Sequence, residues 1–321
     1  MSFAQQVART AQRPIQQAAR SFSSHLRKAP SLSKIVTSTA EEGGMGWLQA
    51  DGEREYPDVP AFRDAVQQDH GQLDIFYVKD SSNFKPKNAL KNALDEAREQ
   101  MQEISYNSGT VGAGVLMTEE ALTLYSCGDC TVALLFPNSK AKDGAPIVIR
   151  PPSGEAVKGK NGAVLRVGGT SAIESKYNFP TVEPVPQLEK VYMDQYQELA
   201  KEHGGAAMAL VVSDGLHTKD SFNDFDFEKL KFHMLKDDKL YAKQQMFDAA
   251  ARAGNSDNKT MYLDYVPEDL QNRLVNVAIF DGHGRQGAAV AQSVAKSTIT
   301  EIEKEVIRSQ HLSPDEKGFS R

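Results

Sequence analysis

Val277-Ala-Ile-Phe-Asp-Gly-His-Gly284, near the C-terminal end of the chain, is the stretch that decides the fold. It completes an apolar run, Leu274 to Phe280, whose length and β-branched content predict a strand. The strand leads into the turn Asp281-Gly-His-Gly284, and a helix is expected over about Gly287 to Arg308. A strand that ends in this way presents its aspartate at the edge of a sheet.

Three further acidic turns share this design. Ser213-Asp214-Gly215 and Gly128-Asp129 each follow an apolar run that predicts a strand, and Asp257-Asn258 lies before another such run. One turn of this kind indicates little by itself, because Asp-Gly and Asn-containing turns commonly separate strands. Carboxylates gathered at strand ends, beside glycines that let backbone carbonyls approach, form an all-oxygen site suited to Mg²⁺ or Mn²⁺. The four turns together therefore predict a site for divalent cations.

The remaining elements are predicted from periodicity and from the turn residues between them. Helices are expected at Asn88–Ile104, at Met193–His203 and over most of Phe227–Ala253. Strands are expected at Leu73–Val78, Ser108–Met117, Ala121–Ser126, Thr131–Phe136, Ile147–Ile149, Ala163–Val167 and Ala206–Val212, and after Asp257-Asn258 up to Val266. The helix over 88–104 has one apolar and one charged face, so we expect it to lie on a sheet.

The composition is that of a soluble globular protein and argues against several functional classes. The 321 residues are 40% hydrophobic and 25% charged, with a formal charge of −6 and no basic stripe in the body of the chain. Nucleic acid is therefore not an expected partner. The two cysteines, Cys127 and Cys130, are too few for a disulfide framework, and their CxxC spacing ends a strand, which disfavours a redox or zinc role. No window approaches the roughly 20 consecutive apolar residues of a transmembrane helix.

The first 40 residues differ in composition from the rest of the chain. They contain no Asp or Glu, and Arg9, Arg13, Arg20 and Arg27 lie within one narrow arc of a helix whose opposite side is apolar. An Arg-rich, Ser-rich and acid-free amphipathic start is typical of an organelle transit peptide. We therefore expect residues 1–40 to act as a transit peptide that the import machinery recognises, and we expect the protein to reside in the mitochondrial matrix. The alternatives are a basic surface arm and a cytoplasmic location.

Five motifs follow one another along the chain. They are Ser108-Gly-Thr-Val-Gly-Ala, Leu124-Tyr-Ser-Cys-Gly-Asp-Cys-Thr-Val-Ala, Ala209-Leu-Val-Val-Ser-Asp-Gly-Leu, Ala-Gly-Asn-Ser-Asp257-Asn-Lys-Thr and Val277-Ala-Ile-Phe-Asp-Gly-His-Gly284. Together they resemble the metal-dependent type 2C protein phosphatases, the PPM family, over roughly residues 84–310. The resemblance implies an α+β fold for residues 41–321, a four-layer α-β-β-α sandwich of two antiparallel sheets flanked by helices. It also implies two Mn²⁺ or Mg²⁺ ions whose bridging water attacks phosphoserine or phosphothreonine of a phosphoprotein substrate.

The resemblance assigns roles to individual residues. Asp281 would bridge the two metal ions, and Gly282 would offer its backbone carbonyl to one of them. Asp214 and Asp257 would complete the carboxylate set of the other ion. His283 would be the general acid for the leaving alkoxide, a role that needs a pKa near neutral. Asp129 resembles a structural turn aspartate instead of a metal ligand.

The order of the motifs departs from the family pattern. In the family the Asp-Gly-His-Gly strand and a helix precede a second helix and the Ser-Gly-Thr strand, whereas Asp281-Gly-His-Gly284 comes last here. A circular permutation cut between those two helices explains the order, since chains tolerate new termini in exposed connections. A rival account keeps the usual order, with Gly52–Asp58 as the early Arg and acidic pair and Ile75–Asp80 as an altered Asp-Gly-His strand. On that account the C-terminal segment is an added or duplicated piece.

The family also has a phosphate-binding Arg and an acidic pair ahead of the Asp-Gly-His strand. The stretch from Asp264 to Leu274 is too short to hold them in the usual way. Arg54 and Arg252 are the candidates for phosphate binding, and Asp58 is a candidate for the acidic pair. Weaker candidates are Arg273 and Glu268. Arg285 replaces the motif's second terminal Gly, and His217 stands where an aromatic residue is common.

Two functions from different classes follow from these observations. The first is a metal-dependent protein serine/threonine phosphatase, because Asp214, Asp257, Asp281 and His283 are all present. The second is a catalytically silent phosphatase-like protein that binds or regulates partners, because the motifs are reordered and the acidic pair has no clear position.

Overall fold

The computed structural model describes residues 36–39, 47–50, 69–101, 109–139, 147–151, 186–217, 225–234, 238–255, 257–283 and 286–311. Residue contacts divide the chain between Lys34 and Ile35, and every described element belongs to the part that begins at Ile35. Of the expected transit peptide, only residues 36–39 are described, and they form a strand of the folded part of the chain, so a leader extending to residue 40 overlaps the fold. The rest of that segment, the short strand expected at 163–167 and the candidates Arg54 and Asp58 lie outside the described residues. None of the helices in these ranges has the length and apolar character needed to cross a membrane.

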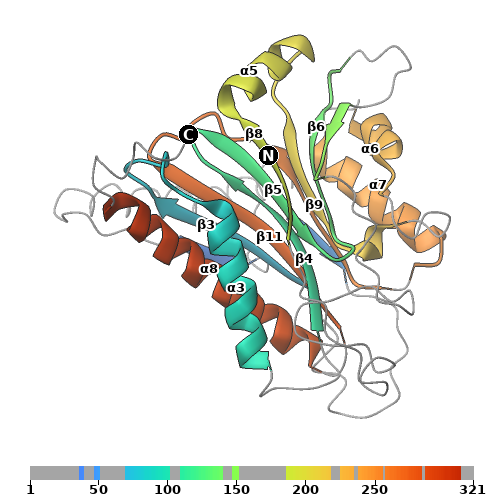
Figure 1. Ribbon diagram of the computed structural model, residues 1–321. Coiled ribbons are helices and arrows are strands. Elements are labelled where there is room, and N and C mark those ends of the chain that lie inside the picture. The colour runs from blue at the N-terminus through green and yellow to red at the C-terminus, as the bar shows by residue number, and fades with distance from the viewer. Residues whose placement is uncertain are drawn as a thin grey trace, which may run out of the picture. The chain divides into compact units, whose positions relative to one another are not determined.

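Two antiparallel sheets form the centre of the fold (Figure 1). The six-stranded sheet has the order β1 (Val36–Thr39), β3 (Asp69–Tyr77), β11 (Arg273–His283), β4 (Gly109–Met117), β5 (Ala121–Cys127) and β8 (Gln187–Tyr192). The five-stranded sheet has the order β2 (Trp47–Ala50), β10 (Lys259–Tyr265), β9 (Met208–Val212), β6 (Thr131–Phe136) and β7 (Ile147–Ile149). The last strand of the chain, β11, thus lies between the third and the fourth.

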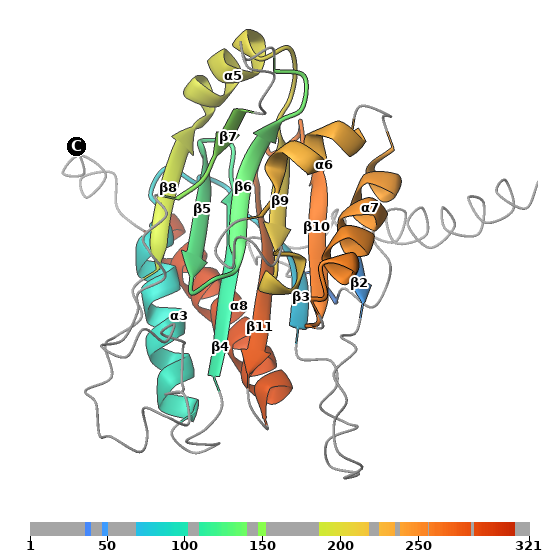
Figure 2. The same cartoon turned by 90° about the vertical axis from the view of Figure 1, so that its right-hand side faces the viewer.

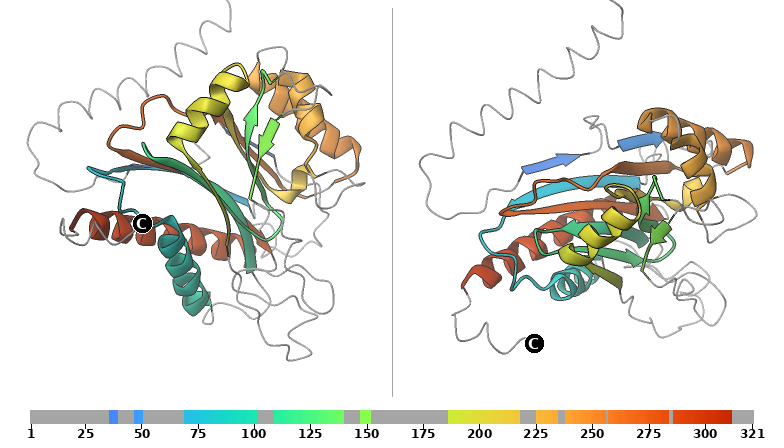
Figure 3. Two further views of the ribbon diagram at one scale, coloured as in Figure 1. Left: turned by 45° about the horizontal axis from the view of Figure 1, so that its top comes forward. Right: turned by 90° about the horizontal axis from the view of Figure 1, so that it is seen from above.

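Helices cover the outer faces of both sheets. The six-stranded sheet is covered by α3 (Pro86–Met101) and α8 (Gly287–His311), which pack against each other. The five-stranded sheet is covered by α6 (Phe227–Met234) and α7 (Lys239–Arg252), while α5 (Met193–Glu202) follows β8 at one end of the sandwich (Figure 2). The layers seen edge-on in Figure 3 follow the order helix, sheet, sheet, helix. The predicted α+β four-layer sandwich is confirmed.

Three apolar cores explain why the strands have nearly continuous apolar sequences. In β11, Val277 and Ile279 point into the core between the sheets, whereas Ala278 and Phe280 point into the core beneath α3 and α8. A strand that is buried on both faces needs apolar residues at every position and not only at alternate ones. The third core joins the five-stranded sheet to α6 and α7. In α8 the buried residues Val290, Val294, Ile302 and Val306 keep helical spacing.

The structure corrects the sequence prediction in two places. The residues Asp281 to His283 continue β11 instead of forming a turn, because β3 pairs with the strand as far as Asp281 and β4 pairs with it to His283. The helix expected over most of Phe227–Ala253 is confirmed and is divided into α6 and α7. The prediction missed β8, an edge strand in which Val191 is the one fully buried residue, so no apolar run marks it.

The topology also bears on the unusual motif order. Because β3 pairs with β11 along nine residues, β3 is the neighbour of the Asp-Gly-His strand and does not replace it. Lys79 and Asp80 follow the end of β3 that lies opposite Arg273, far from Asp281, so the interpretation of Ile75–Asp80 as an altered Asp-Gly-His strand is wrong. Which rearrangement produced the chain order stays a prediction.

Candidate metal centre

The first two carboxylates of the site lie side by side on neighbouring strands. Asp281, near the end of β11, is paired directly with Asp69, the first residue of β3. Both residues are buried, with 2% and 6% of their surface exposed. Their carboxyl groups lie within hydrogen-bonding reach of each other. Two acidic groups in such a contact share a proton or hold a cation between them.

Hydroxyl groups from the five-stranded sheet hold Asp69 in place. Ser213 Oγ and Thr260 Oγ1 each donate a hydrogen bond of 2.8 Å to Asp69 Oδ2. Ser213 Oγ also accepts a 3.0 Å hydrogen bond from the backbone N–H of Thr260. The carboxylate at the edge of one sheet is therefore fixed by the strand ends of the other sheet. These bonds close the end of the sandwich where the acidic residues meet.

The other two carboxylates come from the five-stranded sheet. Asp214 directly follows Ser213 at the end of β9, and Asp257 lies just before β10, whose start is antiparallel to the end of β9. The carboxyl group of Asp214 lies within hydrogen-bonding reach of Asp281, and the charge of Asp257 acts on both Asp281 and Asp69. The structure therefore brings the three predicted aspartates together and adds Asp69 to them.

Burial and mutual repulsion make this cluster unfavourable as a set of bare anions. Burial raises the pKa of Asp281 well above its ordinary value, and the charges of Asp69 and Asp214 raise that pKa further. Burial also raises the pKa of Asp69, although the hydrogen bonds from Ser213 and Thr260 work in the opposite direction. A buried cation would favour the ionised form of each carboxyl group.

The donor set fits a hard divalent cation. Among the described residues no hydrogen-bond donor reaches Oδ1 of Asp69 or Oδ2 of Asp281, although both atoms are buried. Carboxylate oxygens of this kind suit Mg²⁺ or Mn²⁺. Within the same ranges, no three His, Cys, Asp or Glu side chains already have the spacing of ligands around one ion.

A close backbone approach shapes the edge of the site at Gly282. A Cβ atom at this position would lie 2.1 Å from the carbonyl oxygen of Gly287, the first residue of α8. No side chain fits at such a distance, so the glycine lets β11 end directly against the start of the helix. Thr110 Oγ1 donates a 2.7 Å hydrogen bond to the carbonyl oxygen of Asp281 and fixes the same stretch from β4.

His283 lies beside the carboxylates and is mostly buried. Its Nδ1 atom is 3.8 Å from Oδ1 of Asp281, and 11% of its side chain is exposed. The two residues are two positions apart on β11, so their side chains leave the same face of the strand. An imidazole here can exchange a proton with a group bound at the carboxylates, as a general acid must.

The cysteines contribute no metal ligand in their protonated form. Both Cys127 and Cys130 are free thiols. Burial raises the pKa of Cys127 to about 12, with the charge of Asp129 adding to the effect. Burial raises the pKa of Cys130 as well, helped by the charges of Asp281 and Asp129. Asp129 therefore faces the same buried region, in the turn between β5 and β6.

Among the described candidates for the phosphate-binding side of the site, Arg252 lies near the carboxylates, whereas Arg273 and Glu268 lie far from them. Arg252 lies in the last turn of α7, near the Asp257 end of the sheet, and its side chain is exposed. Arg273 lies eight residues from Asp281 along β11, a separation of about 26 Å at 3.3 Å per residue. Glu268 follows the far end of β10. Arg273 and Glu268 are therefore wrong as parts of this site.

Asp69 was not predicted as a site residue because the sequence places the start of this strand at Leu73, and Asp69 falls in the polar stretch before it. Asp69 is the first residue of β3, and an antiparallel strand begins where its neighbour finishes. The same geometry places Asp257 at the start of β10 beside the end of β9. The available signal was Asp69-His70-Gly71 directly before an apolar run, which an antiparallel partner strand would bring to the acidic edge.

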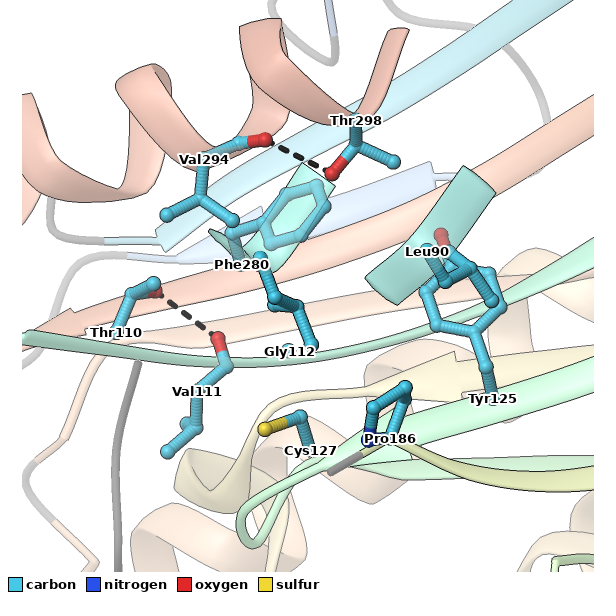
Figure 4. Close-up of a pocket in the computed structure, with 11 residues that line it drawn as sticks. Leu90, Thr110, Val111, Gly112, Tyr125, Cys127, Pro186, Phe280, Val294 and Thr298 are labelled. Atoms are coloured by element: carbon cyan, nitrogen blue, oxygen red, sulfur yellow. Dashed lines mark hydrogen bonds between the residues drawn. The ribbon is translucent and has the colours of Figure 1, made fainter. Parts of the chain in front are cut away.

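A small cavity lies on the other side of the six-stranded sheet from the carboxylates (Figure 4). Its volume of about 20 Å³ has room for about one water molecule. Leu90 and Val294 line it from the two helices, and Gly112 and Tyr125 line it from the sheet. Because it is mostly apolar and faces the helices, we assign it no part in the metal centre.

Comparison with solved structures finds bacterial phosphatases. A bacterial serine phosphatase is 14% identical, with a TM-score of 0.42, and covers 74% of this chain and 99% of its own. The serine/threonine phosphatase Stp1 from Staphylococcus aureus is also 14% identical, with a TM-score of 0.37 and coverage of 75% and 99%. The catalytic domain of the phosphatase PstP, solved with two manganese ions, is 12% identical, with a TM-score of 0.36 and coverage of 77% and 99%.

All three are named as serine or serine/threonine phosphatases. At such identities and TM-scores we draw no conclusion about activity from the similarity. No family model matches the chain, and no curated protein sequence matches it either. We therefore infer function from the carboxylate cluster itself.

Proposed function

We propose that this chain is a metal-dependent protein serine/threonine phosphatase that holds two Mn²⁺ or Mg²⁺ ions. The observation that supports this most directly is the meeting of Asp69, Asp214, Asp257 and Asp281 at one end of the sandwich. Neither sheet alone supplies the whole set, so the fold itself assembles it. Asp281 contacts both Asp69 and Asp214, which suits it to bridge two ions, as the motif resemblance implies.

The chain's own residues would divide the work between binding and proton transfer. When bound, the two cations would lower the pKa of a water molecule and offset charge that develops on the phosphoryl oxygens. The four aspartates would hold the ions, and Ser213 and Thr260 would keep Asp69 oriented. The carbonyl of Gly282 stays a predicted ligand. His283 would donate a proton to the leaving alkoxide of the phosphoserine or phosphothreonine side chain.

We further propose that the phosphatase works in the mitochondrion after import through residues 1–40. The support is the acid-free, Arg-rich composition of that segment. Fusing residues 1–40 to a fluorescent reporter tests this. Reporter that stays in the cytosol would refute the import proposal without bearing on the enzyme.

The activity is tested with the full chain and metal-free buffer. Hydrolysis of para-nitrophenyl phosphate and of a phosphothreonine peptide is measured with and without added Mn²⁺. We expect turnover that requires the metal and falls by at least about a hundredfold in Asp214→Asn and Asp281→Asn, as expected when a charge-stabilising group is removed. Asp269→Asn changes an exposed carboxylate at the far end of β11 and should behave like the unchanged protein.

The same experiment separates the two candidate functions. Hydrolysis that is indifferent to Mn²⁺, or equal in Asp281→Asn and the unchanged chain, would refute a metal-dependent phosphatase. Binding of Mn²⁺ without any hydrolysis would favour the silent, partner-binding protein instead. Calorimetric titration with Mn²⁺ alone therefore accompanies the kinetics.

A further inference from the structure

The end of helix α7 has a defined backbone geometry that leads directly to the metal centre. Gly254 has φ of 76°, a left-handed conformation that glycine adopts without strain. Its N–H bonds to the carbonyl of Ala251 at 2.8 Å, and the N–H of Asn255 bonds to the carbonyl of Ala250 at 3.0 Å. These two bonds are the Schellman arrangement that ends many helices. The backbone of Asn255 is therefore fixed by the helix that precedes it.

The side chain of Asn255 links the two turns that carry carboxylates of the five-stranded sheet. Its Nδ2 donates to the carbonyl oxygen of Asp214 at 3.2 Å and to that of His217 at 3.0 Å. Its Oδ1 accepts a 3.0 Å hydrogen bond from the N–H of Asp257. One amide group thus bonds to the backbone of Asp214 on one side and of Asp257 on the other.

The two turns are also in direct backbone contact. A Cβ atom at Gly215 would lie 1.8 Å from the carbonyl oxygen of Asn258, so only glycine permits this approach. The buried Lys259 donates from Nζ to the carbonyl oxygen of Asp257 at 2.9 Å. The Asp257 backbone is therefore held from both sides, by Asn255 and by Lys259. A shift of either turn would have to break these contacts.

We propose that Asn255 is a positioning residue that makes Asp214 and Asp257 act as one ligand set. The inference rests on the proposed metal-dependent phosphatase and adds that one of its two ions depends on Asn255 more than the other. Asp69 and Asp281 are positioned by the pairing of β3 with β11, and Asp69 also by the hydroxyls of Ser213 and Thr260, whose backbones hydrogen-bond to each other and not to the Asn255 side chain. Loss of Asn255 should therefore affect the ion on the Asp214 and Asp257 side.

The chemistry of the amide explains why asparagine suits this position. The site needs a donor for two carbonyl oxygens and an acceptor for one N–H, and a primary amide supplies both. Alanine supplies neither, and leucine supplies neither at a similar side-chain volume. Removing a group that orients a metal ligand typically lowers metal affinity by about tenfold to a hundredfold.

The test is a calorimetric titration of the full chain with Mn²⁺, together with electron paramagnetic resonance. The unchanged protein should bind two ions and show the exchange-coupled spectrum of a manganese pair. In Asn255→Ala and Asn255→Leu, we expect one affinity to fall by about tenfold or more while the other is kept. At limiting Mn²⁺ the spectrum should change to that of isolated ions. Gln244→Ala, on the exposed side of the same helix, serves as the control.

The outcomes distinguish the inference from the function on which it rests. If the unchanged chain binds no Mn²⁺, the proposed function fails and the inference fails with it. If two ions bind equally well in both Asn255 variants, Asn255 does not position the ligands, while the proposed function stands. Equal loss of both ions would also overturn the inference. The unfolding temperature without metal shows that the variants are folded.

Discussion

Replacing Asp74 by asparagine should stabilise the fold at neutral pH and leave it unchanged in acid. Asp74 lies on β3 with its side chain beneath the helices and has no exposed surface. Its Oδ2 accepts hydrogen bonds from the Gln72 side chain and, at 3.0 Å, from Asn276 Nδ2. Asn276 Oδ1 in turn accepts a 3.0 Å bond from the hydroxyl of Tyr125, which reaches it across Gly114. Within the described residues, no donor reaches Asp74 Oδ1.

The size of the effect follows from the pKa of Asp74. Burial raises this pKa from 3.8 to about 6, against the opposing effect of the bonds from Gln72 and Asn276. A difference of about 2.2 at 1.36 kcal/mol per pKa unit is about 3 kcal/mol. Because the folded-state pKa is the higher one, the stability is fully present below pH 3.8 and is lost as pH rises through about 6. Above that pH the folded protein carries the full cost of a buried charge.

The assay is urea unfolding of the unchanged chain and of Asp74→Asn at pH 4, 6 and 8, without metal. Asparagine resembles the protonated aspartate, so the two free energies of unfolding should agree at pH 4. They should differ by about 3 kcal/mol at pH 8, with Asp74→Asn the more stable. Comparing the two proteins at each pH cancels the titration of distant groups such as Asp281.

Glu198→Gln, an exposed change on α5, is the control and should show no such pH-dependent difference. A stability difference between Asp74→Asn and the unchanged chain that is constant from pH 4 to pH 8 would contradict the reasoning. A less stable Asp74→Asn at pH 8 would contradict it more strongly, because the ionised carboxylate would then be worth more than its burial costs.

Three further predictions concern the metal centre. Mn²⁺ should raise the unfolding temperature more at pH 8 than at pH 5, because the raised pKa values of Asp69 and Asp281 make protons compete with the ion; equal shifts would contradict this. Thr260→Val should lower the free energy of unfolding by about 1–3 kcal/mol in urea, since it removes a donor from buried Asp69, and an unchanged midpoint would count against that bond. Gly282→Ala should cost about 1–3 kcal/mol and weaken Mn²⁺ binding, because its Cβ would meet the carbonyl of Gly287; calorimetry showing unchanged affinity would refute this.

Elements with strong local signals were predictable from sequence. The strands β6 and β7 have the predicted bounds, and β4 and α5 differ from the prediction by one residue. Of these, β4 and β6 are apolar along nearly their whole length and are buried accordingly. The strand β8 lacks such an apolar run, since its place at a sheet edge leaves most of its residues partly exposed. Its existence depends on pairing with β5, which a local pattern does not record.

The sequence predicted the candidate site as a cluster of carboxylates, but it did not identify Asp69 as a member. Asp214, Asp257 and Asp281 could be chosen because each adjoins a recognisable strand and a glycine or asparagine. Asp69 was not chosen because the strand was expected to begin at Leu73, whereas β3 begins at Asp69 itself. Arg273 was wrongly considered as a site residue because the sequence does not show the direction of β11 in the sheet. That direction decides which end of the strand carries the site.

The sequence by itself determined which segments are buried strands and which acidic residues stand at their ends. That information is local, because it depends on side-chain size, polarity and the turn preferences of neighbouring residues. Only the tertiary structure decided that Asp69, at the start of β3, meets Asp281, near the end of β11. The reason is that antiparallel pairing joins residues by their position along strands and not by their distance along the chain. The packing of the two sheets then brings Ser213 and Thr260 to Asp69 and completes the cluster.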